Sequence, residues 1–293
     1  MRADPAARAQ ATARPPLGHV LVTADDLGAS TEVNAAVARA HRDGVLTGAS
    51  LLVAGDALDE AVALARATPG LAVGLHLALA DARPVLPSRE VPHLVGADGR
   101  LLQDPARVFL RLASSAAARR EAAREIAAQV DRFVATGLPL SHVDGHHHLH
   151  LHPAVFPVVA ERAARAGARG IRLPWEGLAA LPEARPRRAA IDAAVLGALA
   201  RGWRGAARRL GLRFADRVHG IVRSGAMDAA YLLALVPRLG GGATELFLHP
   251  STAPGDARGP NPRDLAALLD PAVRAALEAR GLALATYAAL ERP

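Results

Sequence analysis

The sequence predicts a single-domain α/β protein of the (β/α)-barrel type (TIM-barrel-like), in an irregular form. Two observations lead to this fold class. About eight short apolar segments alternate with longer segments of helical periodicity, which is typical of parallel strands joined by crossover helices. A chain of 293 residues also suits a barrel better than an open sheet. Residues 1–16 are polar and contain prolines, so we expect them to form a disordered leader. Because no linker divides the rest of the chain, we expect one domain over residues 17–293.

Apolar segments bounded by glycine, proline or polar residues predict the strands. In chain order they are residues 19–24, 45–53, 71–79, 140–143, 170–173, 217–222, 244–248 and 282–286. The third strand leads into residues 81–103, which contain three prolines and an Asp-Gly turn and are therefore predicted to form a loop.

Helical periodicity and capping residues predict the helices between these strands. In residues 31–43 the apolar side chains share one face, and Gly44 ends the helix. Asp104 followed by Pro105 is typical of a helix start, and the long helix that begins there is predicted to end at Gly137. The other predicted helices are residues 56–69, 153–167, 187–209, 228–239 and 262–280.

The composition excludes several classes of function. The chain has no cysteine and no lysine, which excludes thiol nucleophiles, thiolate zinc sites, Schiff bases and P-loop chemistry. The net charge of +7 is spread along the chain and only 3% of residues are aromatic, so we expect no nucleic-acid partner. No segment has the ~18–20 apolar residues of a membrane span. We therefore expect a cytoplasmic protein with at most a peripheral membrane contact through residues 185–213.

The most informative segment is residues 142–152, which hold six of the 12 histidines together with Asp144. In an extended strand, the even-numbered residues of this segment would share one face. So many imidazoles make a poor core because each ring needs hydrogen-bond partners, whereas neutral imidazole is the commonest metal ligand. One ion cannot use all six, so we expect the strand to end within the segment. His146, His148 and His150 all stay candidates for metal or substrate binding.

Other polar residues stand where predicted strands end. Asp25 and Asp26 follow the first strand, and in a regular strand they would point to different sides, so that one holds a metal while the other polarises a water. His249 follows the strand at residues 244–248. Arg172 ends another strand, where it would either orient an anionic or hydroxyl-rich substrate or pair with a carboxylate.

His76 is a polar residue within the apolar sequence of the third strand. The small residues Gly74 and Ala78 flank it on the same face, which we interpret as space beside the imidazole ring. All these polar residues lie at carboxyl ends of strands, the rim that carries the chemistry of barrel enzymes. We therefore predict a metal-dependent hydrolase in which one carboxylate and two imidazoles hold one divalent ion, either zinc or magnesium. A neighbouring carboxylate would take a proton from water, and a more distant histidine would protonate the leaving group.

At these residues the sequence resembles the YdjC-like carbohydrate deacetylases. The shared motifs occur in the family's order between about residues 19 and 287. They are Thr-Ala-Asp-Asp-Leu-Gly at 23–28, Gly-Leu-His-Leu at 74–77, His-Val-Asp-Gly-His-His-His-Leu-His at 142–150, and Leu-His-Pro at 248–250. Leu27 and Gly145 differ from the residues that are more frequent in the family, and neither difference removes a ligand.

The resemblance implies a (β/α)-barrel-like fold and hydrolysis of the acetamido group of an N-acetylglucosaminyl substrate, giving glucosamine and acetate. The implied ligands of the divalent ion are Asp26, His76 and His146. Asp25 would be the general base, His249 the general acid, and Asp144 would orient an imidazole. Residues 83–87 and 219–227 resemble the members associated with hopanoid biosynthesis. That resemblance implies an amino sugar linked to a lipid and a location at the inner membrane surface.

Two other interpretations stay open at this point. A phosphoesterase on the same scaffold usually needs two metals, and Asp144 with the additional histidines would be available for a second ion. A non-catalytic metal- or sugar-binding protein has no use for a base beside the metal. In such a protein Asp25→Asn would leave ligand binding almost unchanged.

Overall fold

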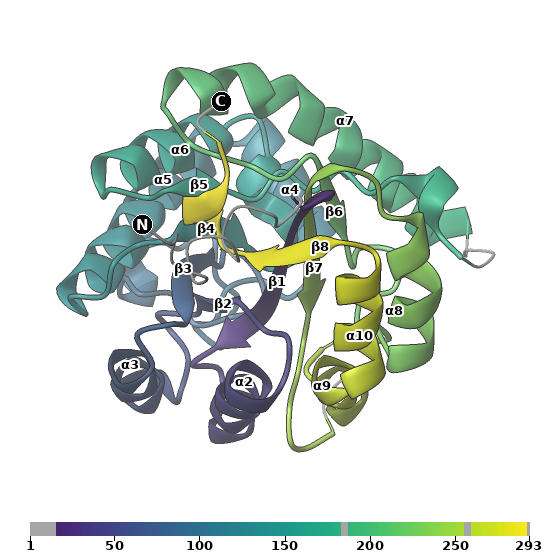
Figure 1. Cartoon of the computed structure of the whole chain (residues 1–293). Coiled ribbons are helices and arrows are strands. Elements are labelled where there is room, and N and C mark those ends of the chain that lie inside the picture. The colour runs from purple at the N-terminus through teal and green to yellow at the C-terminus, as the bar shows by residue number, and fades with distance from the viewer. Residues whose placement is uncertain (1–15, 183–186, 255–258, 292–293) are drawn as a thin grey trace, which may run out of the picture.

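The protein is built on one parallel sheet, seen in a computed structural model that describes residues 16–182, 187–254 and 259–291 (Figure 1). The strands are β1 Gly18–Leu27, β2 Gly48–Leu51, β3 Ala72–Leu77, β4 His142–Gly145, β5 Gly170–Ile171, β6 Arg217–His219, β7 Gly242–Leu248 and β8 Leu282–Ala285. They are ordered β5-β4-β3-β2-β1-β7-β6, and β8 also pairs with β1. β1 is the central strand, because it pairs with β7, with β8 and, at its carboxyl end, with β2.

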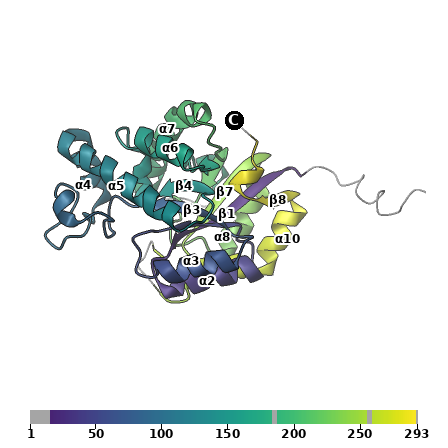
Figure 2. The same cartoon turned by 90° about the vertical axis from the view of Figure 1, so that its left-hand side faces the viewer.

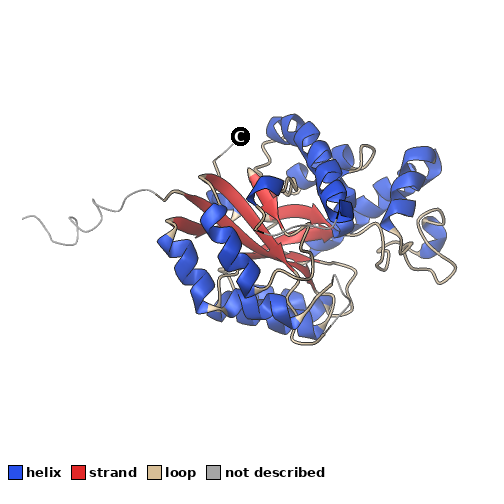
Figure 3. Ribbon diagram, turned by 90° about the vertical axis from the view of Figure 1, so that its right-hand side faces the viewer, coloured by secondary structure: helices blue, strands red, loops and turns tan. Residues whose placement is uncertain are grey.

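Helices surround the strands, as Figure 3 shows in blue and red. They are α2 Thr31–Asp43, α3 Leu58–Ala67, α4 Pro105–Ser114, α5 Ala116–Ala135, α6 Phe156–Arg165, α7 Arg187–Arg209, α8 Ala229–Leu235, α9 Pro262–Leu269 and α10 Pro271–Ala279. Figure 2 shows α4 and α5 on the side of the molecule opposite to β8 and α10. Short 3₁₀ helices complete the described chain: η1 Ser88–Glu90, η2 His146–Leu151, η3 Leu178–Ala180, η4 Val236–Arg238 and η5 Tyr287–Ala289.

The sheet curls into an incomplete barrel. In the described residues β5 and β6 do not pair as strands, and isolated backbone hydrogen bonds connect their surroundings instead. The N–H of Ile171 donates to the carbonyl of Arg213 at 2.8 Å, and the N–H of Val218 donates to the carbonyl of Trp175 at 3.2 Å. The predicted fold class, an irregular (β/α)-barrel-like α/β protein, is confirmed.

Two of the predicted helices are each divided in two. Ser115 ends α4 and caps α5, because its hydroxyl accepts the backbone N–H of Ala118 at 3.2 Å. Asp270 does the same between α9 and α10, accepting the N–H of Ala272 at 2.8 Å, and Pro271 follows it at the first helical position. A residue that caps a helix has a non-helical backbone, so the chain bends at both positions.

The predicted leader, apart from Pro16, lies outside the described residues. No helix in the described part of the chain is long and apolar enough to cross a membrane.

Candidate active site

The end of β1 brings two carboxylates to the same place. The register of β1 against β2 shifts between Ala24 and Leu27, which marks a β-bulge, and Asp26 adopts a left-handed backbone conformation with φ 65°. A carboxylate oxygen of Asp25 lies within 4.8 Å of a ring nitrogen of His76. Asp26 Oδ1 lies 3.4 Å from Nε2 of the same ring. Both side chains therefore lie near His76, although Asp25 also pairs with Arg172 and Asp26 also lies beside His146.

Asp26, His76 and His146 converge on a common point. His76 Nε2 lies 3.2 Å from His146 Nδ1, and Asp26 Oδ1 lies 3.4 Å and 3.3 Å from those two nitrogens. Ligands of a tetrahedral zinc ion, with bonds of about 2.0–2.1 Å, are about 3.3 Å apart, so this triangle has the size that a metal ion requires. Asp26 Oδ1 is buried and has no hydrogen-bond partner among the described residues, and a bound cation would satisfy it.

The charge balance around this point also favours a cation. Several buried carboxylates lie here, and the guanidinium of Arg172 pairs with all of them except that of Asp26. They belong to Asp25, Asp26, Asp144 and Glu245. Burial alone would raise the pKa of Asp26, but His146 and His76 outweigh burial and hold that pKa well below its usual value. Asp26 is therefore ionised, the form that binds a metal.

Asp144 fixes the orientation of the His76 ring. His76 Nδ1 donates to Asp144 Oδ1 at 2.8 Å, so Nε2 of the same ring faces Asp26 and His146. Burial lowers the pKa of His76, but the Asp144 carboxylate outweighs burial and raises that pKa to about 9. A proton and a metal ion therefore compete for His76 Nε2.

The glycine beside His76 does not leave the space that the sequence predicts. A β-carbon at Gly74 would lie 2.6 Å from ring atoms of His142, so the absence of a side chain makes room for that second ring. His142 in turn stacks on Tyr287, with ring centroids 4.7 Å apart. The interpretation of Gly74 as open space beside His76 is wrong, because a packed imidazole fills it.

The histidine-rich segment is a strand only at its start. β4 ends at Gly145 and η2 follows directly, with left-handed φ values of 53° at His147 and 56° at His148. The alternation of even-numbered residues on one face therefore stops at Gly145, within the segment as expected. Of the three candidate ligands in η2, His146 is the one that lies beside Asp26.

The other two candidates lie elsewhere. His150 is fully buried, and its Nε2 donates to the backbone carbonyl of Arg172 at 2.9 Å, which ties η2 to the end of β5. His148 packs with its edge against the ring of Phe247, with centroids 5.4 Å apart. Nδ1 of His148 is buried without a hydrogen-bond partner in the described chain, and its predicted role in substrate binding stays a prediction.

Arg172 is fully buried at the centre of an ionic network. Its Nη1 and Nη2 donate to the two carboxylate oxygens of Asp25 at 2.7 Å and 2.8 Å, and Nη2 also lies 2.9 Å from Asp144 and from Glu245. Burial lowers the pKa of Arg172, but the carboxylates outweigh it and raise that pKa well above its usual value. Two roles were predicted for Arg172, and its position agrees with one of them, the pairing with carboxylates.

Two residues of the network were not predicted from the sequence. Glu245 lies in the middle of β7 with 0% exposure, and it accepts hydrogen bonds from Thr23 Oγ1 at 2.9 Å and from Tyr287 Oη at 2.6 Å. A carboxylate inside an apolar strand was the signal that could have identified Glu245. Tyr287 belongs to η5 at the end of the described chain, and no local pattern distinguishes it.

His249 follows β7 and faces Asp25. Its Nε2 lies 3.9 Å from Asp25 Oδ2, and its side chain is 12% exposed. The backbone N–H of His249 donates to the Asp264 carboxylate at 2.9 Å, which fixes the chain where the strand ends. The ring is therefore held next to Asp25 while still reaching solvent.

Two further groups of side chains could hold an ion. They are Asp81, His146 and His147, and Asp25, His76 and Asp144. In the first group Asp81 and His147 are 49% and 36% exposed, and their nearest atoms are 3.8 Å apart. In the second group Arg172 already forms ion pairs with both carboxylates. The triangle of Asp26, His76 and His146 therefore suits a metal ion best.

These observations define a class of protein. It has a barrel-like α/β fold and a buried histidine–aspartate centre at the carboxyl ends of its strands. The model of the family described as "YdjC-like protein" matches residues 19–279, which is most of the chain. The chain belongs to this family, as its motifs predict.

Several curated relatives carry the same kind of name. A carbohydrate deacetylase of Geobacillus stearothermophilus is 32% identical over 278 residues, which cover 92% of this chain and 96% of that protein. A carbohydrate deacetylase of Brevibacillus brevis is 41% identical over 156 residues, covering 53% of this chain and 59% of the relative. A chitooligosaccharide deacetylase of Escherichia fergusonii is 38% identical over 151 residues, covering 50% of this chain and 56% of the relative. The matches to the last two span little more than half of those proteins.

A solved structure supports the fold. The crystal structure of an Enterococcus faecalis V583 protein superposes with a TM-score of 0.72, covering 92% of this chain and 98% of that chain at 23% identity. This likeness shows the shared barrel-like architecture.

Proposed function

We propose that this protein is a metal-dependent deacetylase that hydrolyses the acetamido group of N-acetylglucosaminyl substrates, releasing acetate and leaving a free amine. The observation that carries the proposal is the triangle of donor atoms on Asp26, His76 and His146, with the carboxylate of Asp25 beside it. The names of the relatives, carbohydrate and chitooligosaccharide deacetylases, support the same reaction.

Asp26, His76 and His146 would hold one divalent ion, zinc or magnesium. When bound, such an ion polarises the acetyl carbonyl and lowers the pKa of a water molecule. The donor set of two imidazoles and one carboxylate is found in catalytic zinc sites that keep a position open for water and substrate.

Asp25 is the group placed to accept the proton of the attacking water. Its two-pronged ion pair with Arg172 fixes the direction of the carboxylate. Water adds to the acetyl carbon, and the bond from that carbon to the amide nitrogen then breaks. His249 is placed to give the leaving nitrogen its proton, because its ring lies next to Asp25 and reaches solvent. Acetate and the amino sugar result.

The test is release of acetate from N-acetylglucosamine and its short oligomers by metal-loaded protein. Asp25→Asn should reduce the rate by about 10²-fold or more, with the metal content unchanged, since it removes only the base. His146→Ala should lose both metal and activity. His19→Gln, at the opposite end of β1, serves as the control and should keep both.

Other outcomes would contradict the proposal. A metal-loaded protein that releases no acetate from any of these sugars is not this deacetylase, and hydrolysis of phosphate esters instead would identify a phosphoesterase. Full turnover by Asp25→Asn would remove that residue from the mechanism. Sugar or metal binding without any turnover would identify a binding protein.

A finer proposal is that the amino sugar is linked to a hopanoid and is reached from a cytoplasmic membrane surface. It is supported by the resemblance of residues 83–87 and 219–227 to the hopanoid-associated members and by the basic residues of α7. Sedimentation with vesicles containing anionic lipid tests it. Retention of the protein by such vesicles, lost at high salt, is expected, and no retention would contradict it.

A further inference from the structure

The residues other than glycine that have a left-handed backbone gather at the candidate active site. In the described chain they are Asp26, Asp81, His147 and His148, with φ between 50° and 65°. This backbone conformation is strained for a residue with a side chain, and strained residues cluster at functional sites. Asp26 would hold the metal ion of the proposed reaction. Asp81 and His147 have no role in that reaction, so their strain needs another explanation.

Asp81 and His147 lie on the solvent side of the triangle of donor atoms. A carboxylate oxygen of Asp81 and ring nitrogens of His146 and His147 are all within 4.8 Å of one another. Side-chain exposure increases outward from the triangle: His76 2%, Asp26 6%, His146 21%, His147 36% and Asp81 49%. This order gives a direction from the buried centre to solvent. A sugar whose acetamido group is at the triangle would therefore lie beside Asp81 and His147.

Hydrogen bonds hold Asp81 in this place although its side chain is exposed. Its backbone N–H donates to the carbonyl of Leu102 at 3.1 Å. Three residues earlier, the buried amide of Gln129 in α5 accepts the N–H of Ala78 at 3.0 Å and donates to the carbonyl of Ala78 at 2.7 Å. A side chain on a fixed backbone loses little freedom when it binds a ligand, which favours binding.

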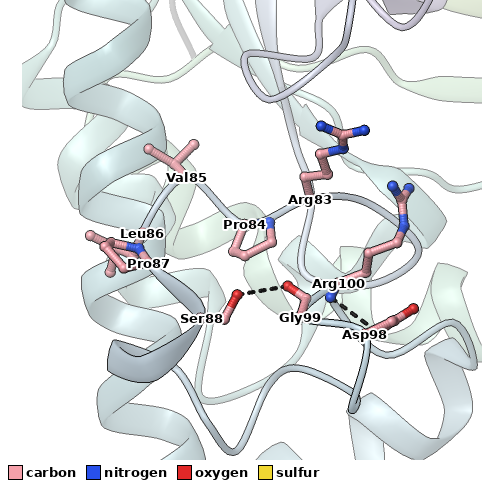
Figure 4. Close-up of a pocket in the computed structure, with 9 residues that line it drawn as sticks. All are labelled: Arg83, Pro84, Val85, Leu86, Pro87, Ser88, Asp98, Gly99 and Arg100. Carbon is pink, nitrogen blue, oxygen red and sulfur yellow. Dashed lines mark hydrogen bonds between the residues drawn. The ribbon is translucent and has the colours of Figure 1, made fainter.

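The carboxylate of Asp81 has no hydrogen-bond partner in the described chain. Its ion-pair partner there is His147, and the 3.8 Å between Oδ2 and Nε2 is too long for a hydrogen bond. Figure 4 shows the next part of the same loop, where Arg83 and Asp98 line a cavity of about 550 Å³. Those two side chains have partners, because Arg83 pairs with Asp56 at 3.5 Å and Asp98 accepts a backbone N–H at 3.1 Å. Asp81 is thus the carboxylate of this loop that is both beside the triangle and open to a ligand.

A hydroxyl group has the right chemistry for the space between Asp81 and His147. The carboxylate accepts the hydrogen of the hydroxyl, and an imidazole with its hydrogen on Nε2 donates to the hydroxyl oxygen. One oxygen can form hydrogen bonds of about 2.7–2.9 Å to both atoms, because these are only 3.8 Å apart. A hydroxyl group would therefore satisfy both side chains at once.

We propose that Asp81 and His147 bind the 3-hydroxyl group of the N-acetylglucosaminyl substrate. The inference rests on the proposed deacetylation and adds to it the residues that hold the sugar ring. The hydroxyl must be close to the acetamido group on carbon 2, because Asp81 and His147 are close to the triangle. Of the two neighbouring ring carbons, carbon 1 carries the link to the rest of the substrate, so carbon 3 carries the free hydroxyl.

The test changes the sugar and the protein together. For metal-loaded wild type we expect kcat/KM to be at least about tenfold higher with N-acetylglucosamine than with its 3-deoxy analogue, since a hydrogen bond to a charged group is lost. Asp81→Gly/His147→Gly should bring this ratio close to one, mainly through a higher KM for N-acetylglucosamine. Glycine adopts the left-handed backbone without strain, so this variant should fold. Asp98→Gly makes the same change elsewhere in the loop and should keep the wild-type ratio.

A binding measurement separates this inference from the proposed reaction. Titration calorimetry of both sugars into metal-loaded Asp25→Asn should show the same preference for the 3-hydroxyl, again lost when Asp81 and His147 are glycine. If neither sugar releases acetate but this preference is found, the deacetylation fails and the hydroxyl site stands. The hydroxyl site is overturned if the wild type does not distinguish the two sugars. It is also overturned if the preference survives in Asp81→Gly/His147→Gly, which would place the hydroxyl elsewhere.

Metal analysis excludes a different role for the same side chains. Asp81, His146 and His147 are close enough together to hold an ion of their own. We expect the same number of bound ions per chain in the wild type and in Asp81→Gly/His147→Gly, because neither residue belongs to the triangle. Fewer ions in the variant would make these residues metal ligands and would overturn the hydroxyl site.

Discussion

Arg172 and Asp25 form a two-pronged ion pair inside the barrel, with nitrogen–oxygen distances of 2.7 Å and 2.8 Å and side-chain exposures of 0% and 3%. Asp25 comes from β1 and Arg172 from the residue after β5, so the pair joins distant parts of the sheet. The planar guanidinium holds both oxygens of Asp25 in one plane. Arg172, which has no exposed surface, therefore fixes the orientation of the Asp25 carboxylate, the base of the proposed reaction.

Replacing Arg172 by lysine tests this relationship. Arg172→Lys keeps the positive charge among the carboxylates, but an ammonium group cannot donate in parallel to both oxygens of Asp25. We expect kcat to fall about 10²-fold, since small displacements of a catalytic group have effects of this size, while KM and metal content change little. A kcat close to that of the wild type would show that the two-pronged contact is dispensable.

Tyr287→Phe tests whether the end of the described chain supports the network. The phenol is buried and donates to Glu245 at 2.6 Å, so its loss leaves a buried carboxylate with one donor fewer. We expect the free energy of unfolding to fall by about 1.5–3 kcal/mol in urea denaturation, the range for hydrogen bonds to charged groups. Thr23→Val removes the other hydroxyl that donates to Glu245 and should have a similar effect. Unchanged stability in both variants would contradict this role for Glu245.

Gly74→Ala tests the packing behind His76. The added methyl group would lie 2.6 Å from the ring of His142, which is itself stacked on Tyr287 and cannot move freely. Overpacking of this kind costs about 1–3 kcal/mol. The matched control is Gly202→Ala in α7, where nothing lies within 4 Å of the new β-carbon. It should raise stability by up to about 1 kcal/mol through helix propensity. Equal effects of the two substitutions on the unfolding midpoint would argue against a packed ring beside Gly74.

Glu125→Ala tests the anchoring of the loop of residues 81–103. It leaves the buried N–H groups of Val85 and Leu86 without their acceptor, which costs about 1–3 kcal/mol for each unsatisfied group. We expect limited proteolysis to cut this loop faster than in the wild type. Glu60→Ala, at an exposed position of α3, should leave the cleavage rate unchanged. Slow cleavage in both variants would show that Glu125 is not needed to order the loop.

The sequence predicted the parts of the protein that depend on short-range patterns. Alternation of strands and helices indicated the barrel-like fold, and the motifs around Asp26, His76 and His146 indicated residues that the structure brings within 3.4 Å of one another. The break at Ser115 was missed because serine inside a helical pattern also occurs without a break. The break at Asp270 did have a signal, because Asp270 followed by Pro271 repeats the helix-start pattern of Asp104 and Pro105.

What the sequence could not predict depends on the backbone or on distant contacts. The bulge between Ala24 and Leu27 interrupts the regular strand, and the left-handed backbone at Asp26 has no reliable sequence signal. Gly74 is small because His142, 68 positions later, fills its place. Tyr287 reaches Glu245 across 42 positions. Such pairs are defined by the folded sheet and not by their neighbours in the chain.

Removal of divalent metal tests the donor triangle independently of any substrate. A ligand that binds only the folded state stabilises it by about 2.7 kcal/mol at one hundred times its Kd, so we expect chelation to lower Tm by about 4–5 °C for a chain of this size. Zinc or magnesium, whichever ion the site accepts, should restore Tm. His76→Ala should abolish the difference between the metal-loaded and chelated protein, because it removes one of the three donor atoms. His19→Gln should keep the full difference, and a shift that persists in His76→Ala would place the ion elsewhere in the protein.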